Sequence, residues 1–413
     1  MNAPVEPDDL SERSRSAIVF VERIGRALHG YGAPANRLED VLEVLSRELK
    51  LAGSFFSTPT AVLYAYDLPG QLGFARLQRV HDHQLDLAKL AALDRLFNRV
   101  LEGRIELDDA TREVDRICAA PAPYPSWSTV SCIALASAAA APFFGGGAPE
   151  CLLAGVGGLV LGLLGLATQH SMLLRRLYEP LGALLVSLIA VVLAAPFGAS
   201  SSMATLAGLI VLVPGFSLTI GATELALNHP ASGTARLAGA MMTLLMLTMG
   251  VILGRQLATV VFGFDAVSIA ATPAAGWLRW TAIPVAGLSL GVLFRTAPRD
   301  LPWSVAAVGL PFLAFEFGLG DIGREASTFV GALIAGCFAN LFARVLDRPS
   351  LIVRLPGILV LVPGSTGLVS LDAIAGGNTE LGVETFFRVA MTATALVAGF
   401  FASNAVLPPR KAL

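Results

Sequence analysis

The sequence predicts a polytopic α-helical membrane protein with about ten transmembrane helices in two inverted five-helix repeats, preceded by an N-terminal cytosolic α+β domain. Three observations lead to this prediction. The 413 residues are 54% hydrophobic and only 15% charged, with a mean hydropathy of +0.68, which is far more apolar than a soluble chain. Most charged residues lie in the first 120 residues. A segment ending in Val-Pro-Gly occurs twice, each time within an apolar stretch.

The first 120 residues have the patterns of a small α+β domain. Apolar residues recur at helical spacing over 11–30 and 35–49, and again over 85–101 and 108–119. Between these pairs, 54–65 and 72–80 are rich in β-forming residues and predict strands. Residues 121–126 contain three prolines and predict a stiff linker. We therefore expect a cytosolic α+β domain over 1–120 and a Pro-rich linker over 121–126.

The rest of the chain contains ten apolar stretches that could cross a bilayer. A hydrocarbon core about 30 Å thick needs roughly 20 largely apolar helical residues. The candidate spans are 127–143, 151–171, 181–197, 203–225, 235–262, 280–294, 302–319, 327–346, 351–374 and 384–406. The first five form a predicted repeat over 127–265, and the other five form a second repeat over 276–413.

The duplicated segment indicates how the two repeats are related. Residues 208–215 (Gly-Leu-Ile-Val-Leu-Val-Pro-Gly) return as 357–364 (Gly-Ile-Leu-Val-Leu-Val-Pro-Gly), an offset of 149 residues that also aligns the other spans. Since five is odd, the second repeat would enter the membrane from the opposite side. Proline removes a backbone donor and glycine tolerates almost any dihedral angle, so each copy predicts a broken helix. Broken helices at matching positions point to a binding site in a transporter.

The basic residues predict the orientation, because short cytosolic loops collect Lys and Arg. The N-terminal residues contain no apolar segment typical of a cleaved signal peptide, so the N-terminus is expected in the cytosol. Ten spans then place most loop arginines on the cytosolic side and only Arg279 and Arg324 on the other. We expect both termini in the cytosol.

Polar and ionisable residues close to the two breaks are the candidate solute ligands. Ionisable groups within a bilayer are costly and usually serve transport. Each half offers one carboxylate and one guanidinium, which together suit an amino acid. The candidates are Pro214, Gly215, Ser217, Thr219, Thr223, Glu224 and Arg236 in the first half, and Pro363, Gly364, Ser365, Thr366, Asp372 and Arg388 in the second. Alternatively, the charged residues lie at the headgroups and the hydroxyls bond their own helices.

Glu316 is the candidate proton carrier. It lies between Phe315 and Phe317 in an otherwise apolar span. Apolar surroundings raise the pKa of a carboxyl group, which would allow proton uptake and release near neutral pH. The alternatives are an ion pair with Arg324 or a position at the headgroups.

Several other classes of protein lack support in the sequence. The four cysteines have no metal-ligand spacing, and His81-Asp82-His83 has no further ligand nearby and is interpreted as a solvated loop. No glycine-rich phosphate loop ends in Lys-Ser/Thr. The net charge of −2 does not favour nucleic acid. We expect no cofactor, no metal and no nucleic-acid partner.

Five segments together resemble the threonine/serine exporter family in its fused two-component form. They are 212–224 (Leu-Val-Pro-Gly-Phe-Ser-Leu-Thr-Ile-Gly-Ala-Thr-Glu), 232–236 (Ser-Gly-Thr-Ala-Arg), 32–37 (Gly-Ala-Pro-Ala-Asn-Arg), 57–60 (Ser-Thr-Pro-Thr) and 355–364. The resemblance covers essentially the whole chain. It implies proton-driven export of threonine and serine across the bacterial inner membrane, whereas some relatives are linked to succinate efflux. The family pattern has Asn and Asp where this chain has Ile220 and Glu224.

The predicted function is therefore secondary active export of small polar amino acids by alternating access. The expected partners are the solute, protons and membrane lipids, with a homo-oligomer as an option. A dicarboxylate exporter, a passive channel and a membrane-bound enzyme with a catalytic cytosolic domain are the alternatives. We do not expect an enzyme, because ten spans exceed what an anchor needs and no Gly-x-Ser-x-Gly elbow occurs.

Overall fold

The computed structural model of the chain describes residues 11–67, 73–80, 84–169, 171–264, 271, 273–362 and 364–409. Residues 12–119 form four helices and three strands, here called the α+β unit. These elements are α1 (Glu12–Gly30), α2 (Ala35–Glu48), β1 (Ala52–Thr58), β2 (Ala61–Asp67), β3 (Phe74–Arg79), α3 (Leu87–Leu101) and α4 (Leu107–Ala119). The predicted helices and strands of this region are thus confirmed, within a few residues at their ends. His81, Asp82 and His83 lie outside the described residues.

The α+β unit is built on an antiparallel sheet with the strand order β1-β2-β3. Every second residue of β2 is buried, including Val62, Tyr64 and Tyr66, as the two-residue period of a strand requires. Helices α1 and α2 contribute Ile24 and Leu42 to the same apolar core. The strands and helices therefore stabilise each other through one shared core.

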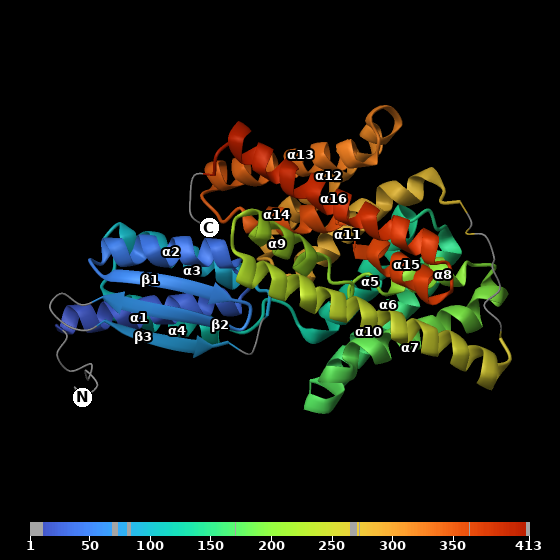
Figure 1. Cartoon of the computed structure of the whole chain (residues 1–413), viewed down its shortest axis with the longest axis horizontal. Coiled ribbons are helices and arrows are strands. Elements are labelled where there is room, and N and C mark those ends of the chain that lie inside the picture. The colour runs from blue at the N-terminus through green and yellow to red at the C-terminus, as the bar shows by residue number, and fades with distance from the viewer. Residues whose placement is uncertain are drawn as a thin grey trace.

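The remaining helices form an elongated bundle beside the α+β unit (Figure 1). They are α5 (Ser126–Phe143), α6 (Ala148–Thr168), α7 (Met172–Phe197), α8 (Ser201–Gly208), α9 (Gly215–Ala226), α10 (Pro230–Phe262), α11 (Gly276–Leu293), η2 (Pro298–Asp300), α12 (Leu301–Ile322), α13 (Arg324–Leu346), α14 (Leu351–Leu361), α15 (Gly364–Ala375) and α16 (Thr379–Val406). Figure 1 shows α9 and α14 at the end of the bundle nearest the α+β unit, called the covered end, and α8 and α15 at the far end.

The bundle is that of a polytopic helical membrane protein. Among the described residues, seven helical stretches are long and apolar enough to cross a membrane, by length and composition. They are Ser126–Phe143, Ala148–Thr168, Leu173–Phe197, Pro230–Phe262, Arg324–Leu346, Leu351–Ala375 and Thr379–Val406. Each of the ten predicted spans coincides with a helix or a consecutive helix pair. The count of ten spans stays a prediction.

Both predicted breaks interrupt their helices. Helix α8 ends at Gly208, and α9 starts only at Gly215, after Pro214 with its ψ of 45°. Helix α14 ends at Leu361, and α15 starts at Gly364 after the extended residue Val362. Pro363, the predicted proline of the second break, lies outside the described residues. Helices α8 and α9 thus correspond to one predicted span, and α14 and α15 to another.

The two breaks touch each other. A Cβ atom on Gly364 would lie 2.6 Å from Cγ1 of Val213 and 3.4 Å from Cα of Gly215. A Cβ atom on Gly215 would lie 3.1 Å from Cγ1 of Val362. Only a residue without a side chain fits such a close approach of two backbones. The duplicated segments, 149 residues apart in sequence, therefore meet in space.

Candidate functional site

A cavity of about 120 Å³ lies where the α+β unit meets the covered end of the bundle. A single water needs about 10–15 Å³, so the cavity can hold several waters or a small solute. The start of α2 forms one wall, and α9, α14 and α16 form the others. Polar side chains that line it include Asn36, Arg37, Thr219, Thr223, Glu224, Arg354 and Asn404. Residues from both halves of the bundle and from the α+β unit thus line one cavity, which has polar and apolar walls.

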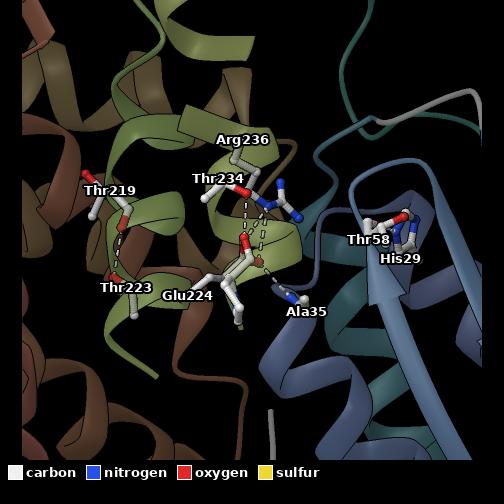
Figure 2. Close-up of polar contacts among 9 residues, drawn as sticks. His29, Ala35, Thr58, Thr219, Thr223, Glu224, Thr234 and Arg236 are labelled. Carbon is white, nitrogen blue, oxygen red and sulfur yellow. Dashed lines mark hydrogen bonds and ion pairs between the residues drawn. The ribbon is translucent and has the colours of Figure 1, made fainter. Parts of the chain in front are cut away.

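Glu224 is the most deeply buried predicted ligand on this cavity. Its side chain is fully buried near the end of α9. Its carboxylate accepts hydrogen bonds from Nε of Arg236, at 3.1 and 3.0 Å to the two oxygens, and from the backbone N–H of Ala35, at 3.0 Å (Figure 2). Arg236 belongs to α10 and Ala35 is the first residue of α2. Glu224 therefore joins the bundle directly to the α+β unit.

The predicted hydroxyl ligands bond mainly to their own helix. Thr219 donates to the carbonyl of Gly215 at 3.1 Å, and Thr223 donates to the carbonyl of Thr219 at 2.8 Å (Figure 2). Both side chains nevertheless line the cavity. Ser217, Ser365 and Thr366 are half-buried and do not line it. Among the hydroxyl candidates, the structure brings only Thr219 and Thr223 to the cavity.

Asp372 and Arg388 of the second half lie elsewhere. Asp372, on α15, forms a two-point ion pair with Arg255 of α10, with distances of 2.9 and 3.0 Å. Arg388 pairs instead with Glu384 one turn away on α16, at 2.7 Å, and both side chains are exposed. Neither residue lines the cavity. The structure thus separates these residues from Glu224 and Arg236, contrary to the expectation of one shared binding set.

Glu316, the candidate proton carrier, has an ionic partner in the structure. Its carboxylate forms an ion pair with Arg279 of α11 at 2.9 Å, and its side chain is 42% exposed. The partner is Arg279 and not Arg324.

Arg354 and Arg37 are cavity residues that the sequence analysis missed. Arg354 lies in the first turn of α14, within the predicted span 351–374, and an ionisable residue within a span is a functional candidate by default. This signal was present in the sequence. Arg37 lies in α2, where burial lowers the pKa of its guanidinium while the charge of Asp40 opposes the shift. Arg37 belongs to the family-like segment 32–37, but only the docking of α2 onto the bundle places its side chain at the cavity.

The α+β unit is held to the bundle by directed polar contacts on both halves. In the first half, Nδ1 of His229 lies 3.3 Å from Oε2 of Glu39 in α2. In the second half, the backbone N–H groups of Leu87 and Ala88 donate to the carbonyls of Phe294 and Arg295, at 3.0 and 3.1 Å. Burial raises the pKa of Glu39 above its usual value, whereas the N–H of Ser57 and the nearby His229 lower it. These contacts fix the α+β unit as the cover of the cavity.

A polytopic helical bundle with contacting helix breaks and a partly polar cavity is typical of membrane transport proteins. Comparison with protein families agrees: residues 19–258 match the model of the threonine/serine exporter family, and residues 280–406 match a second model described as "Threonine/Serine exporter, ThrE". The first model alone covers more than half of the chain. The chain therefore belongs to the threonine/serine exporter family, in a form with both components fused.

Curated relatives are found in yeasts. The chain is 27% identical to "Pheromone-regulated membrane protein 10" of Kluyveromyces lactis, over 97% of this chain and 44% of that protein. The proteins of the same name from Candida albicans (strain WO-1) and Saccharomyces cerevisiae (strain YJM789) are also 27% identical, over 89% and 91% of this chain and 34% and 50% of their own lengths. The chain thus spans half or less of the length of these relatives. No solved structure matches it.

Proposed function

We propose that the protein is a secondary active exporter of small polar amino acids, threonine and serine, which works by alternating access around its two broken helices. The observation that carries this proposal is the cavity with polar side chains in its lining, formed partly by α9 and α14, the helices that adjoin the contacting breaks. Solute would enter the cavity, and movement of one half against the other would open it to the opposite side. Thr219, Thr223 and Glu224 are the predicted ligands that line the cavity.

We further propose that the two halves are inverted repeats of five spans each. The helix packing supports this, since the neighbours α5–α6, α6–α7, α7–α10 and α9–α10 have the counterparts α11–α12, α12–α13, α13–α16 and α15–α16. Close backbone contacts recur at the same offset. Gly250 lies against the carbonyl of Pro180, and Gly399, 149 residues later, lies against the carbonyl of Phe329.

The proposed orientation places both termini and the α+β unit in the cytosol, in a multi-pass protein of the bacterial inner membrane. The basic residues of the loops support the cytosolic side of the α+β unit. The covered end of the bundle would then face the cytosol, and the cavity would hold a solute taken from there. The direction of transport would be outward.

Proton coupling belongs to the same proposal. We retain Glu316 as the proton carrier, but we propose that it acts through its ion pair with Arg279 rather than through apolar burial. Protonation would neutralise its carboxylate and release the ion pair with Arg279, which joins α12 to α11. Loss of such a pair between two helices is a local charge change that can bias a two-state element.

A dicarboxylate such as succinate is the second candidate solute. The specific observation in its favour is that the cavity is lined by two guanidinium groups, Arg37 and Arg354. Catalysis in the α+β unit is the weaker alternative, because family membership points to transport rather than to an enzyme.

Reconstitution in proteoliposomes tests the proposal. Uptake and counterflow of threonine, serine and succinate would be compared with and without an imposed proton gradient. We expect gradient-driven accumulation of threonine or serine, and its loss when Pro214 and Gly215, or Pro363 and Gly364, are both replaced by Ala. The matched control is Gly239→Ala, since a Cβ at Gly239 meets nothing within 4 Å. Full transport by both double variants would refute the role of the breaks, and equilibration without accumulation would indicate a channel.

A further inference from the structure

Arg354 is a cation in the cavity wall without a carboxylate partner among the residues that the structure describes. Its Nη2 lies 3.5 Å from Oδ1 of Asn404, at the limit of a hydrogen bond, and its guanidinium lies 5.1 Å from the ring centroid of Phe400. Its Nε is buried and has no hydrogen-bond partner in the described part of the chain. A buried guanidinium normally pairs with an anion, so Arg354 still has donors to offer.

Glu224, the carboxylate that lines the same cavity, is not the missing partner of Arg354. One of its oxygens accepts from Ala35 and both accept from Arg236. Arg236 itself is not part of the cavity lining. The cavity therefore combines the guanidinium of Arg354, unpaired with any carboxylate in the described chain, with a carboxylate whose charge Arg236 already compensates. Arg37 also lines the cavity, with the charge of Asp40 nearby. The electrostatic character of the space favours an anionic group.

The packing of the helices does not by itself require a cation at position 354. In the first half, the residue at the same offset of 149 is Thr205 of α8. Its hydroxyl donates to the carbonyl of Ser201 in its own helix at 2.7 Å, and it is buried. The same position within the repeat is thus filled by a neutral residue bonded to its own helix in the first half, and by an arginine that lines the cavity in the second half.

We propose that the guanidinium of Arg354 binds the carboxylate of the transported solute, and that this cavity is the carboxylate subsite of the exporter. The planar, two-pronged guanidinium matches the two oxygens of a carboxylate. Arg37 and Asn36 of the α+β unit form the opposite wall and enclose the bound group. This inference rests on the proposed transport function and adds the chemical class of ligand, a small carboxylate supplied by an amino acid or by a dicarboxylate.

The test is a binding measurement on the purified full-length protein by titration calorimetry, separate from transport. The probes are L-threonine, threoninol, which lacks the carboxylate, N-acetylthreonine, which lacks the ammonium group, and succinate. We expect threoninol not to bind, and at least one of the three carboxylates to bind. Binding of N-acetylthreonine would show that the carboxylate suffices, and binding of succinate alone would identify a dicarboxylate as the source.

Variants locate the subsite. Arg354→Gln should weaken carboxylate binding by roughly 10- to 100-fold, as expected for loss of hydrogen bonds to a charged group. Arg354→Lys should fall between Arg354→Gln and the wild type, because it keeps the charge and loses the fork. The matched control is Arg344→Gln, since Arg344 lies outside the cavity on α13 and should leave affinity unchanged.

Threoninol binding as tight as that of threonine, or unchanged carboxylate affinity in Arg354→Gln, would overturn the subsite even if the wild type transports amino acids. Absence of carboxylate binding to the wild type would overturn it as well. A third outcome separates the two proposals. If Arg354→Gln loses carboxylate binding but the wild type transports nothing in proteoliposomes, the subsite is supported and the exporter proposal is refuted. If Arg354→Gln fails to fold, the threonine and threoninol comparison on the wild type decides.

Discussion

Two of the places where the two halves of the bundle meet, one at each end, are closed in different ways. At the far end, α10 of the first half contacts α15 of the second, and the ion pair of Arg255 with Asp372 joins them directly. At the covered end, α9 contacts α16, but a cavity lies beside them and the α+β unit closes it. Glu224 at this end bonds to Arg236 of its own half and to Ala35 of the α+β unit. The far end is thus closed by an ion pair between the halves, and the covered end is closed by the α+β unit.

Under the proposed alternating-access mechanism, a cavity at the covered end and a direct ion pair at the far end correspond to a transporter that is closed to the far side. In the opposite state, the Arg255–Asp372 pair would have to break. The following predictions test this comparison, from the largest expected effect to the smallest.

Loss of Glu224 should be the most damaging change at the covered end. Glu224→Ala leaves Arg236, whose side chain is 19% exposed, without its partner. Breaking a buried ion pair costs about 3–5 kcal/mol, and we expect a loss near the lower value. Thermal unfolding of the purified protein in detergent measures it. Glu384→Ala, which removes an exposed pair on α16, should change stability by less than about 0.5 kcal/mol; equal losses in both variants would contradict the assigned role of Glu224.

The two breaks contact each other between the two ends of the bundle, and Gly364→Ala should disrupt this contact. The new Cβ would meet Val213 at 2.6 Å, and overpacking of this kind costs about 1–3 kcal/mol. Thermal unfolding measures the loss, and Gly239→Ala is the control with open space around its Cβ. A neutral Gly364→Ala would show that the two breaks do not lie in contact.

At the far end, Asp372→Asn should cost about 1 kcal/mol, because both members of its ion pair are about 30% exposed and water screens them. A double-mutant cycle with Arg255→Gln measures the coupling of the two residues. The exchange of charges, Arg255→Asp with Asp372→Arg, should restore part of the loss. Additive effects of the two single variants would exclude a direct bond between the halves at this junction.

Glu39 at the rim of the covered end should give a small pH dependence. Its folded-state pKa is raised above 4.5 by burial, so the folded protein binds more protons than the unfolded chain between these two pKa values. Stability should therefore fall as the pH rises through this window. Glu39→Gln removes the titration and should flatten this part of the profile, by less than about 1 kcal/mol. Unfolding midpoints of the wild type and of Glu39→Gln would be measured between about pH 4 and pH 7, the range where carboxyl groups titrate. The same pH dependence in both proteins would show that Glu39 is not responsible.

The sequence was sufficient to predict the helices and the breaks, but not the partners of the charged residues. Hydropathy and the Pro-Gly strings depend on local composition, so the spans and the interruptions after Gly208 and Leu361 could be predicted. The pairing of Asp372 with Arg255 depends on which helix faces which, over 117 residues of separation. For the same reason, the pairing of Glu316 with Arg279 of α11 could not be predicted. Arg354 could have been found, since its position within an apolar span was visible.

The α+β unit is hydrogen-bonded to both halves of the bundle, through Ala35 to the first half and through Leu87 and Ala88 to the second. Under the proposed movement of one half against the other, at least one of these attachments would have to break each time the angle between the halves changes. The rate of that detachment would then limit the turnover rate, so residues of the α+β unit would control the speed of transport.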